Sequence, residues 1–466
     1  MASVYLGLKR AVIVAGSNPA VIGLGGTELT WTAFEKQVQL LAHAINHEVL
    51  ALPQHSKACN VAYIGRNSVE FLQYIYALAL LGNVLVPLNI RWSNSEISFA
   101  LADSECEILV IDQEFADATG LAEMLKSTSV KSVILIRQGT NKSVDMPEYS
   151  PEFQQQYNIH VHNDFSVQEE TVHAEFILKA ESELKKNDDL HCIVYTSGTT
   201  GKSKGVMLTH LNQVAQASEK VGRLGLSAAA AAAAAAPPRY LNAAPLFHVG
   251  GLSAALAVAA AGGAHAFCPG GRFTASSALS IIAQHRINLL VVVPAMLLDV
   301  VAEASDRNIL LGSVKMILVG GQALDAKTFQ STREVCPNSA VVQTYACTEA
   351  CSTISFKTLT DCASGTTAEQ EPGGEERAAG GSVAGLFGLP AGAPASHTDV
   401  RIVDEATGLP AAAAAAAAGR IQVRGPAVAR GYWRRPDLTR ETFLPGGWLD
   451  TGDLGFLSPA AAAGAA

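Results

Sequence analysis

Residues 193–205 of the chain read IVYTSGTTGKSKG. The stretch begins with apolar and β-branched residues, which favour a strand, and continues with hydroxyls, three glycines and two lysines. Glycines allow a tight turn that brings backbone N–H groups close to an anion, while hydroxyls and lysines add donors and positive charge. The stretch therefore predicts a strand followed by a phosphate-binding loop, with a nucleoside triphosphate as the ligand.

The generic phosphate-loop pattern GxxxxGK[ST] nearly fits at residues 201–203, but it requires a glycine where this chain has Thr196. A Walker-type NTPase therefore stays open as an alternative. Taken whole, the stretch resembles the signature of the adenylate-forming superfamily, which contains acyl-CoA synthetases, peptide-synthetase adenylation domains and luciferases. That signature usually reads YTSGTTGxPKG, and this chain departs from it once, with Ser203 in the proline position. By this resemblance the residues that bind the nucleotide phosphates are Thr196, Ser197, Gly198, Thr199, Thr200, Gly201 and Lys204.

The overall composition sets further limits. With 466 residues, 49% of them apolar, the chain is long enough for a large multi-lobed enzyme. Its formal net charge of −9 gives no basic footprint of the kind that nucleic-acid-binding proteins show. We therefore expect no nucleic-acid partner, and we expect local cations to hold an anionic substrate.

The cysteines and the apolar segments bear on location. The eight cysteines are scattered, and the close pair Cys347 and Cys351 lacks partners at zinc-site spacing, which predicts a reducing intracellular compartment and no structural metal. Residues 1–21 contain an apolar patch too short for the core of a signal peptide. The most apolar window, residues 249–268, is rich in Ala and Gly, and we expect a buried helix and strand there rather than a membrane span.

Hydrophobic periodicity predicts strands that alternate with helices. Helices are expected to begin at two capping boxes, Thr32 with Glu35 and Ser93 with Glu96, and strands are expected at 60–64, 84–88, 107–112, 132–136, 289–293 and 315–319. This alternation is typical of a doubly wound parallel sheet. We therefore predict an α/β fold with two doubly wound lobes, residues 1–190 and 191–385, and a small β-rich subdomain at residues 386–466.

Several stretches lack a patterned face. Residues 138–189 are polar with little periodicity and are expected to form a connecting excursion. Alanine runs at 228–236, 411–418 and 460–466, and the Gly- and Glu-rich residues 365–381, have nothing to pack with. We expect surface connections there, and these stretches carry no functional information.

Two short motifs lie between the phosphate loop and residue 325. Residues 244–252 read APLFHVGGL and resemble the PLFHxxG motif of the superfamily, in which the histidine lies at the mouth of the acyl pocket. The resemblance gives His248 a catalytic position, although a histidine beside Phe and Leu is otherwise typical of a core. Residues 319–324 read VGGQAL and resemble the GGAPL segment that lines the adenine. Gly320, Gly321 and Gln322 are therefore expected at the base, with a plain strand-to-helix turn as the alternative.

Two further motifs complete the nucleotide site. Residues 345–349 read YACTE and resemble the family's YGxTE; by that resemblance Tyr345 packs against adenine, Thr348 bonds a phosphate, and Glu349 holds Mg²⁺ as the metal ligand. Thr348 and Glu349 are therefore expected to act in catalysis. Ala346 replaces the family glycine, which is expected to tighten the approach to the nucleotide. Residues 448–453 read WLDTGD and match the family's WxxTGD, where the final carboxylate, Asp453, can accept hydrogen bonds from both ribose hydroxyls.

A sixth motif precedes this one, since residues 419–426 read GRIQVRGP and residues 431–433 read GYW. They resemble the family's GEIxVRGP and GYW, with Arg420 in place of a glutamate. Within the superfamily, residues 245–253, 273–296 and 345–352 look most like the plant and algal o-succinylbenzoate-CoA ligases of phylloquinone synthesis. The resemblance implies that ATP and Mg²⁺ activate a small-molecule carboxylic acid as an acyl-adenylate, which then passes to coenzyme A. The alternatives are a 4-coumarate- or fatty-acid-CoA ligase, and a nucleotide-binding remnant without catalysis.

The family pattern continues beyond the TGD motif with a hinge and a small lobe whose lysine reaches the adenylate-forming centre. In this sequence no lysine follows Asp453. We therefore expect the C-terminal lobe to be missing and the complete reaction, thioester formation above all, to be impaired. The resemblance also leaves a chloroplast or a peroxisome open as the location, without a clear targeting signal.

Overall fold

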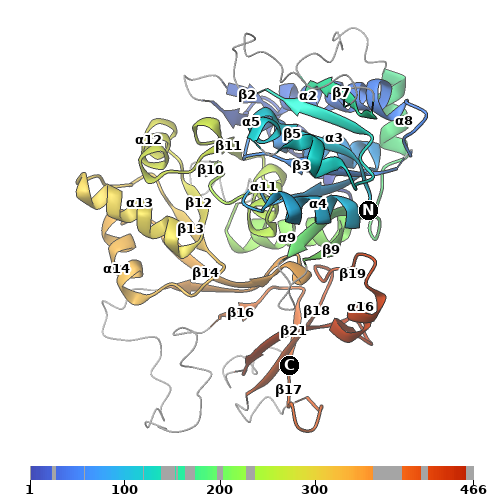
Figure 1. The fold of residues 1–466 in the computed structure, drawn as a ribbon. Helices are drawn as coiled ribbons and strands as arrows, with labels where there is room; N and C mark the ends of the chain where they lie inside the picture. Colours follow the sequence, from blue (N-terminus) through green and yellow to red (C-terminus); the bar gives the residue numbers. More distant parts are fainter. Residues whose placement is uncertain are drawn as a thin grey trace.

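Two large mixed sheets and a smaller antiparallel sheet organise the fold (Figure 1). The structure, a computed structural model, describes residues 2–23, 28–56, 58–118, 120–137, 153, 156–162, 174–196, 203–226, 237–359, 391–410 and 418–457. Residues 365–381 and the alanine runs, apart from Ala418, lie outside these ranges. None of the helices within them is long and apolar enough to cross a membrane.

The eight-stranded sheet contains the strand that leads into the phosphate-loop stretch. The strands from β8 to β7 run parallel, whereas β9 pairs antiparallel with both β8 and β19. The expected strands at 60–64, 84–88, 107–112 and 132–136 are confirmed as β3 to β6. Across the sheet the order is β19 (Gly431–Tyr432), β9 (Lys204–Thr209), β8 (Leu190–Thr196), β4 (Val84–Pro87), β3 (Asn60–Ile64), β5 (Cys106–Asp112), β6 (Ser132–Ile136) and β7 (Asn158–Val161).

The nine-stranded sheet has a parallel centre and antiparallel edges. The strands expected at 289–293 and 315–319 are confirmed as β12 and β13. Its order is β16 (Ala393–Pro394), β15 (Ser352–Leu359), β14 (Ala340–Cys347), β13 (Met316–Val319), β12 (Leu289–Val292), β10 (Arg239–Leu241), β11 (Ala264–Ala266), β1 (Pro19–Ile22) and β2 (Glu28–Thr30). The four-stranded sheet has the order β17 (Asp399–Val403), β18 (Gly419–Arg424), β21 (Trp448–Gly455) and β20 (Phe443–Leu444).

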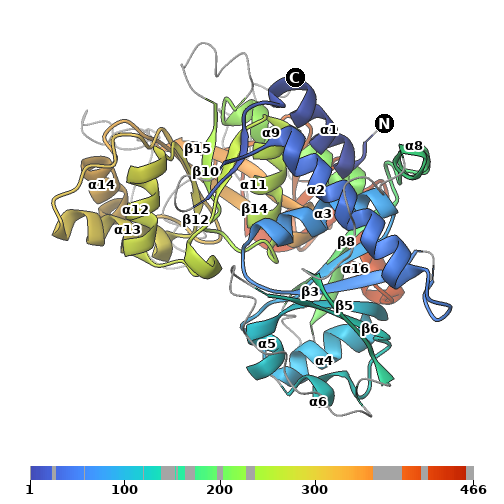
Figure 2. The ribbon, with the colours of Figure 1, turned by 90° about the horizontal axis from the view of Figure 1, so that it is seen from above.

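Helices form a layer between the two large sheets and further layers outside them (Figure 2). The inner layer holds the main core and consists of α1 (Val4–Ala15), α2 (Trp31–Ala44), α3 (Val69–Leu81), α9 (His210–Arg223) and α11 (Val249–Ala260). The outer face of the eight-stranded sheet is covered by α4 (Asn94–Asp103), α5 (Gln113–Ala118) and α6 (Leu121–Leu125). That of the nine-stranded sheet is covered by α12 (Ala275–His285), α13 (Pro294–Asp306) and α14 (Ala326–Val335). Parallel strands need such cover on both faces, and the predicted α/β class is confirmed.

The remaining helical elements are short or peripheral. A π-helix, η1 (Ile45–Leu50), continues α2, and the 3₁₀ turns η4 (Pro269–Gly271) and η5 (Thr348–Ala350) follow β11 and β14. Helix α8 (Ala174–Ser182) and strand β7 lie within the polar residues 138–189, and α16 (Pro436–Thr442) follows β19.

The two large sheets are not built from consecutive halves of the chain. Strands β1 and β2 of the N-terminal region join β11 in the nine-stranded sheet, while β8, β9 and β19 join the sheet formed by β3 to β7. The predicted domain boundaries at residues 190 and 385 are not tested by this strand pairing and stay a prediction.

Two local expectations have different outcomes. The capping box at Ser93 and Glu96 is confirmed at the start of α4. The one at Thr32 and Glu35 is wrong, because Thr30 caps α2 by accepting from the N–H of Ala33. The helix begins earlier in the chain than predicted, because Trp31 is buried as its first residue. The side chain of Glu35 does not cap the helix and instead accepts a hydrogen bond from the Tyr5 hydroxyl at 3.4 Å.

Residues 249–268 form α11 and β11, which confirms the expected buried helix and strand. The beginning of α11 packs closely against the preceding backbone at Gly251. A Cβ atom there would lie 2.2 Å from the carbonyl oxygen of Pro245 and 2.6 Å from that of Ala244. Backbone carbonyls cannot rotate away as a side chain can, so this position excludes any larger residue.

We expect Gly251→Ala to lower the free energy of unfolding by about 3 kcal/mol, because the new methyl group overlaps the main chain. The matched control is Gly222→Ala in α9, where a Cβ meets nothing within 4 Å and alanine favours a helix. Urea denaturation of both variants measures the difference. Equal stability of the two variants would contradict the close packing at Gly251.

Candidate active site

Three side chains meet where the phosphate-loop stretch enters β9. The ammonium of Lys204, the first residue of β9, lies 3.3 Å from a carboxylate oxygen of Glu349 in η5. It also donates to the hydroxyl of Tyr432 at 2.7 Å and lies 4.2 Å from the centre of that ring. The Tyr432 hydroxyl donates in turn to Glu349 at 2.7 Å. We call Lys204, Tyr432 and Glu349 the charge cluster.

Backbone pairing holds the charge cluster in place. Strand β19 pairs antiparallel with β9, which sets Tyr432 opposite Val206. The backbone oxygen of Glu349 accepts from the N–H of Ala429 at 2.8 Å. Burial, and next the charge of Glu349, raise the pKa of Tyr432 far above its ordinary value, so the phenol keeps the proton that it donates. The cluster thus holds one cation and one carboxylate, joined by a neutral hydroxyl.

The phosphate loop itself, including Ser197, Gly198, Thr199, Thr200 and Gly201, lies outside the described residues. Its two ends are described, because Thr196 closes β8 and pairs across the ladder with Lys204. Within the described residues the buried hydroxyl of Thr196 has no hydrogen-bond partner. A buried hydroxyl without a partner is unusual, because buried polar groups are generally hydrogen-bonded.

Tyr345 and Asp453 form a second pair next to the charge cluster. The Tyr345 hydroxyl donates to the Asp453 carboxylate at 2.6 Å, which joins β14 to β21. Burial, and next this hydrogen bond, raise the pKa of Tyr345 above its ordinary value. Gly452 adopts a φ of 84° just before Asp453, where the pairing of β21 with β18 shifts its register, and Asp453 is exposed there. The structure thus brings together the residues that the sequence assigns to adenine and ribose.

Gly320 and Gly321 follow β13 and lie beside the strand that carries Tyr345. A Cβ atom at Gly320 would lie 2.6 Å from the Thr344 hydroxyl, and Gly321 has a φ of 86°. The position of Gly321 therefore favours glycine, whereas a side chain at Gly320 would displace the Thr344 hydroxyl, and Gln322 after them is exposed. Ala346, which replaces the family glycine, is also exposed, at a register shift between β14 and β15.

Thr348 is buried as the first residue of η5, and the turn after it is strained. Cys351 has a φ of 56° and Ser352 a φ of 120°, values that residues other than glycine rarely adopt. Strain of this kind persists only where surrounding contacts maintain it, and it clusters at functional sites.

His248 caps the start of α11, and its Nδ1 accepts from the N–H of Gly250 at 3.1 Å. The ring is exposed to solvent, yet partial desolvation by the surrounding protein lowers the pKa of His248, with the Lys220 charge as a smaller cause. Lys220 in turn donates to Ser352 at 3.2 Å. Ser352 follows the turn that carries Glu349.

The residues present fit a magnesium ion held with nucleotide phosphates. No group of three His, Cys, Asp or Glu side chains that could hold a metal occurs in the described part of the chain. Magnesium is typically bound by one or two carboxylates together with substrate phosphates and water. Glu349, beside the end of the phosphate loop, supplies such a carboxylate.

Sequence reasoning assigned no role to Tyr432 and did not single out Lys220. Tyr432 belongs to the GYW motif, and this membership is a signal from which a role for it could be predicted. Lys220 lies on the buried face of α9, where a helical pattern does not distinguish a cation from a surface residue. The departure at Arg420 finds a partner in Asp450 of the WLDTGD motif, at 2.9 Å.

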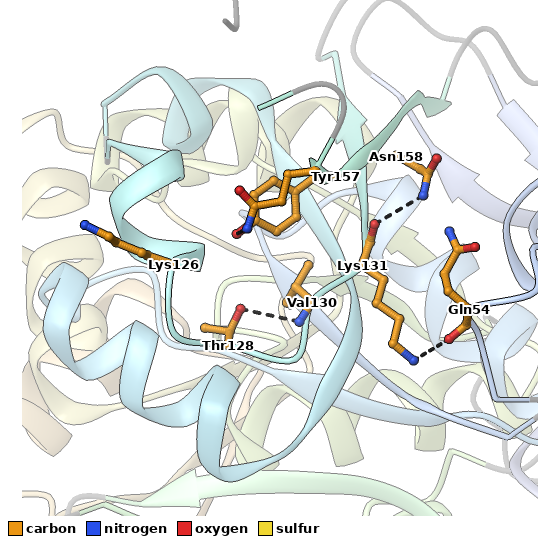
Figure 3. Close-up of a pocket in the computed structure, with 8 residues that line it drawn as sticks. Gln54, Lys126, Thr128, Val130, Lys131, Tyr157 and Asn158 are labelled. Carbon is orange, nitrogen blue, oxygen red and sulfur yellow. Dashed lines mark hydrogen bonds between the residues drawn. The ribbon is translucent and has the colours of Figure 1, made fainter. Parts of the chain in front are cut away.

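A separate surface pocket of about 410 Å³ lies beside the beginnings of β6 and β7 in the eight-stranded sheet (Figure 3). Lys131 there donates to the carbonyl oxygen of Gln54 and pairs with Glu107 at 2.9 Å, so its charge is already balanced. None of the predicted site residues lines this pocket, and we assign it no role. Its lining consists of Gln54, Lys126, Thr128, Val130, Lys131, Gln156, Tyr157 and Asn158.

Solved structures share this fold. The inhibitor-bound N-terminal domain of FACL13 from Mycobacterium tuberculosis has a TM-score of 0.72 and 21% identity, covering 99% of this chain and 98% of that one. The O-succinylbenzoate coenzyme A synthetase (MenE) of Bacillus subtilis, in complex with ATP and a magnesium ion, has a TM-score of 0.70 and 24% identity, covering 97% and 77%. These identities show the fold alone, which is that of the large region of adenylate-forming enzymes.

Residues 8–433 match the family described as AMP-binding enzyme, so the chain belongs to this family, and the resemblance drawn from the motifs is confirmed. The chloroplastic/peroxisomal 2-succinylbenzoate–CoA ligase of Arabidopsis thaliana is 29% identical over 401 residues, 84% of this chain and 64% of that protein. A feruloyl-CoA synthase of an Amycolatopsis species is 29% identical over 435 residues, 92% of this chain and 71% of that protein. The chain thus spans 64% and 71% of the length of these relatives.

We expect Tyr432→Phe to lower the free energy of unfolding by about 1–2 kcal/mol, because Lys204 and Glu349 lose the hydroxyl that bonds to both. The matched control is Tyr240→Phe, since Tyr240 is equally buried and its hydroxyl has no partner among the described residues. That variant should match the wild type. Calorimetry measures the free energy of unfolding of both variants. If Tyr432→Phe is no less stable than Tyr240→Phe, the hydrogen bonds of the Tyr432 hydroxyl contribute nothing to stability.

Proposed function

We propose that the protein activates a carboxylic acid with ATP and transfers the acyl group to coenzyme A. The observation that carries this proposal is the charge cluster, which lies at the end of the phosphate-loop stretch and beside the Tyr345–Asp453 pair. Membership of the AMP-binding family supports it, as do the CoA-ligase and CoA-synthase names of the relatives.

In the first step a carboxylate oxygen of the acid attacks the α-phosphorus of ATP. A new P–O bond forms, the bond to the bridging oxygen of the β-phosphate breaks, and pyrophosphate leaves with both electrons. In the second step the thiol of coenzyme A attacks the acyl carbon of the adenylate, and AMP leaves. The thioester product keeps the acyl group activated.

The charge cluster suits the first step because negative charge accumulates on the phosphates. Lys204 leaves Glu349 and pairs with a phosphate oxygen, while the Tyr432 hydroxyl continues to donate to Glu349 and orients it. A magnesium ion bound by Glu349 would neutralise phosphate charge when present. The loop residues Ser197, Gly198, Thr199, Thr200 and Gly201, with Thr196, provide further donors to the phosphates.

The Tyr345–Asp453 pair serves the nucleoside. Asp453 gives up its hydrogen bond with Tyr345 and accepts hydrogen bonds from the ribose hydroxyls instead. The ring of Tyr345 packs against one side of the adenine, and Gly320, Gly321 and Gln322 line the base. Thr348 bonds a phosphate beside Glu349, and His248 faces the acyl group at the start of α11. These roles extend the resemblance residue by residue.

For the acid we propose an aromatic dicarboxylate such as o-succinylbenzoate. Apart from Leu252, residues 250–254 are small, and we propose that the ring lies beside this segment, next to the reacting carboxylate. The 2-succinylbenzoate–CoA ligases of Arabidopsis thaliana and Bacillus mycoides, each 29% identical, support this choice. The former is named chloroplastic/peroxisomal, and on that resemblance we propose one of these two locations for this chain. An aromatic monocarboxylate is the second candidate, because feruloyl-CoA synthase is equally similar to the chain.

We expect exchange of labelled pyrophosphate into ATP that depends on o-succinylbenzoate. Glu349→Gln should lower its rate about 100-fold or more, because the removed charge acts on the transition state. The control Glu123→Gln, at an exposed carboxylate of α6, should exchange like the wild type.

Nucleotide binding is measured on the same samples by calorimetry. A sample that binds ATP but exchanges with no carboxylic acid would overturn the proposal. Release of orthophosphate without any acid would instead favour the Walker-type alternative. Exchange with 4-coumarate or a medium-chain fatty acid in preference to o-succinylbenzoate would keep the reaction and replace the substrate.

A further inference from the structure

Lys220 is a lysine buried completely between three elements. Its residue exposure is 1%, and its ammonium donates to the Ser253 hydroxyl on α11 and to the Ser352 hydroxyl at the start of β15, the latter at 3.2 Å. Both partners are neutral. The neighbouring Glu219 faces elsewhere, since it pairs with Arg223 at 3.0 Å and accepts from the N–H of Ser396. Within the described residues, Lys220 therefore lacks a carboxylate partner.

A buried ammonium without a counter-charge is costly, because water no longer solvates it. Burial accordingly lowers the pKa of Lys220 to about 7, against a smaller raising effect of Cys351. Cys351 is no counter-ion, since burial raises the pKa of its thiol and keeps it neutral. A methionine would fill the same volume without this cost, so packing alone does not account for a lysine here.

The position of Lys220 relates it to the acyl group. Ser253 belongs to residues 250–254, the small segment proposed to face the acid, and Lys220 is close enough to His248 to lower its pKa. Ser352 follows η5, which carries Glu349, by two residues, and it is held at a φ of 120°. Two hydroxyls and one ammonium therefore converge between the proposed acyl segment and the reacting centre.

We propose that Lys220, with the hydroxyls of Ser253 and Ser352, binds the second carboxylate of an aromatic dicarboxylic acid. The inference rests on the proposed function and names the group that selects its substrate. The carboxylate supplies the missing counter-charge and accepts hydrogen bonds from all three side chains, for which the Ser253 hydroxyl turns away from the carbonyl oxygen of Val249 to which it donates in this structure. An acid without that carboxylate leaves the ammonium unpaired, and the site therefore discriminates against aromatic monocarboxylates.

Two stable acyl-adenylate analogues test this directly, because binding does not require the complete reaction. Both are acyl sulfamoyl adenosines, one built on the succinyl carboxyl of o-succinylbenzoate and the other identical except that it lacks the ring carboxylate. We expect the wild type to bind the first about 10- to 100-fold more tightly in calorimetry, as for a hydrogen-bonded charge pair. Lys220→Met should bind both equally, with the affinity for the second unchanged or improved.

The control Lys126→Met removes an exposed lysine and should keep the wild-type preference. Ser352→Ala and Ser253→Ala provide a second test if Lys220→Met does not fold, and each should weaken binding of the dicarboxylate analogue alone by about 10-fold. These variants keep the lysine and remove one neutral hydroxyl each.

The possible failures are distinct. If the wild type binds both analogues equally, or if Lys220→Met keeps the preference or weakens both equally, the assignment of Lys220 is overturned while adenylation stands. If neither analogue binds to a folded wild type, the proposed function fails, and the role of Lys220 fails with it.

Discussion

The hydroxyl of Tyr432 joins three segments of the chain that are far apart in sequence. It accepts from Lys204 at the start of β9 and donates to Glu349 after β14, across 228 and 83 residues. Both charged partners are largely shielded from water, so each depends on the other and on the hydroxyl between them. The eight-stranded sheet, the turn after the nine-stranded sheet and the chain leading to the small sheet meet at this bond.

Much of the fold follows from local pattern. Strands β5 and β6 are almost continuously apolar, as buried parallel strands require, and the Ala-rich residues of α11 fit a helix buried on all sides. Helix α2 begins at the buried Trp31, with Thr30 as its cap, although the local capping pattern at Thr32 predicts a later start. Which strands share a sheet is decided by pairing across long distances, for which a periodic pattern contains no signal.

Some residues of the site could likewise be predicted from sequence motifs, and others could not. The motifs predict Lys204, Glu349, Tyr345 and Asp453 in one site, and the structure brings them into an ion pair and an adjacent hydrogen-bonded pair. The hydroxyl of Tyr432 acquires its role from antiparallel pairing with β9, and Lys220 acquires its role from burial against α11 and β15. Both depend on tertiary neighbours, and a single sequence does not contain that information. Arg420 shows the converse, because its departure from the family pattern is matched by Asp450.

The interleaving of the two large sheets also affects how the chain can be made. Val21 of β1 pairs beside His265 of β11, and Val206 of β9 beside Tyr432 of β19. During synthesis the early strands therefore leave the ribosome long before their neighbours exist, with unpaired backbone edges and apolar faces uncovered. Such non-local pairing slows folding and lengthens the time in which open edges can aggregate. A nascent chain of this topology is consequently a natural client for chaperones until residue 432 has emerged.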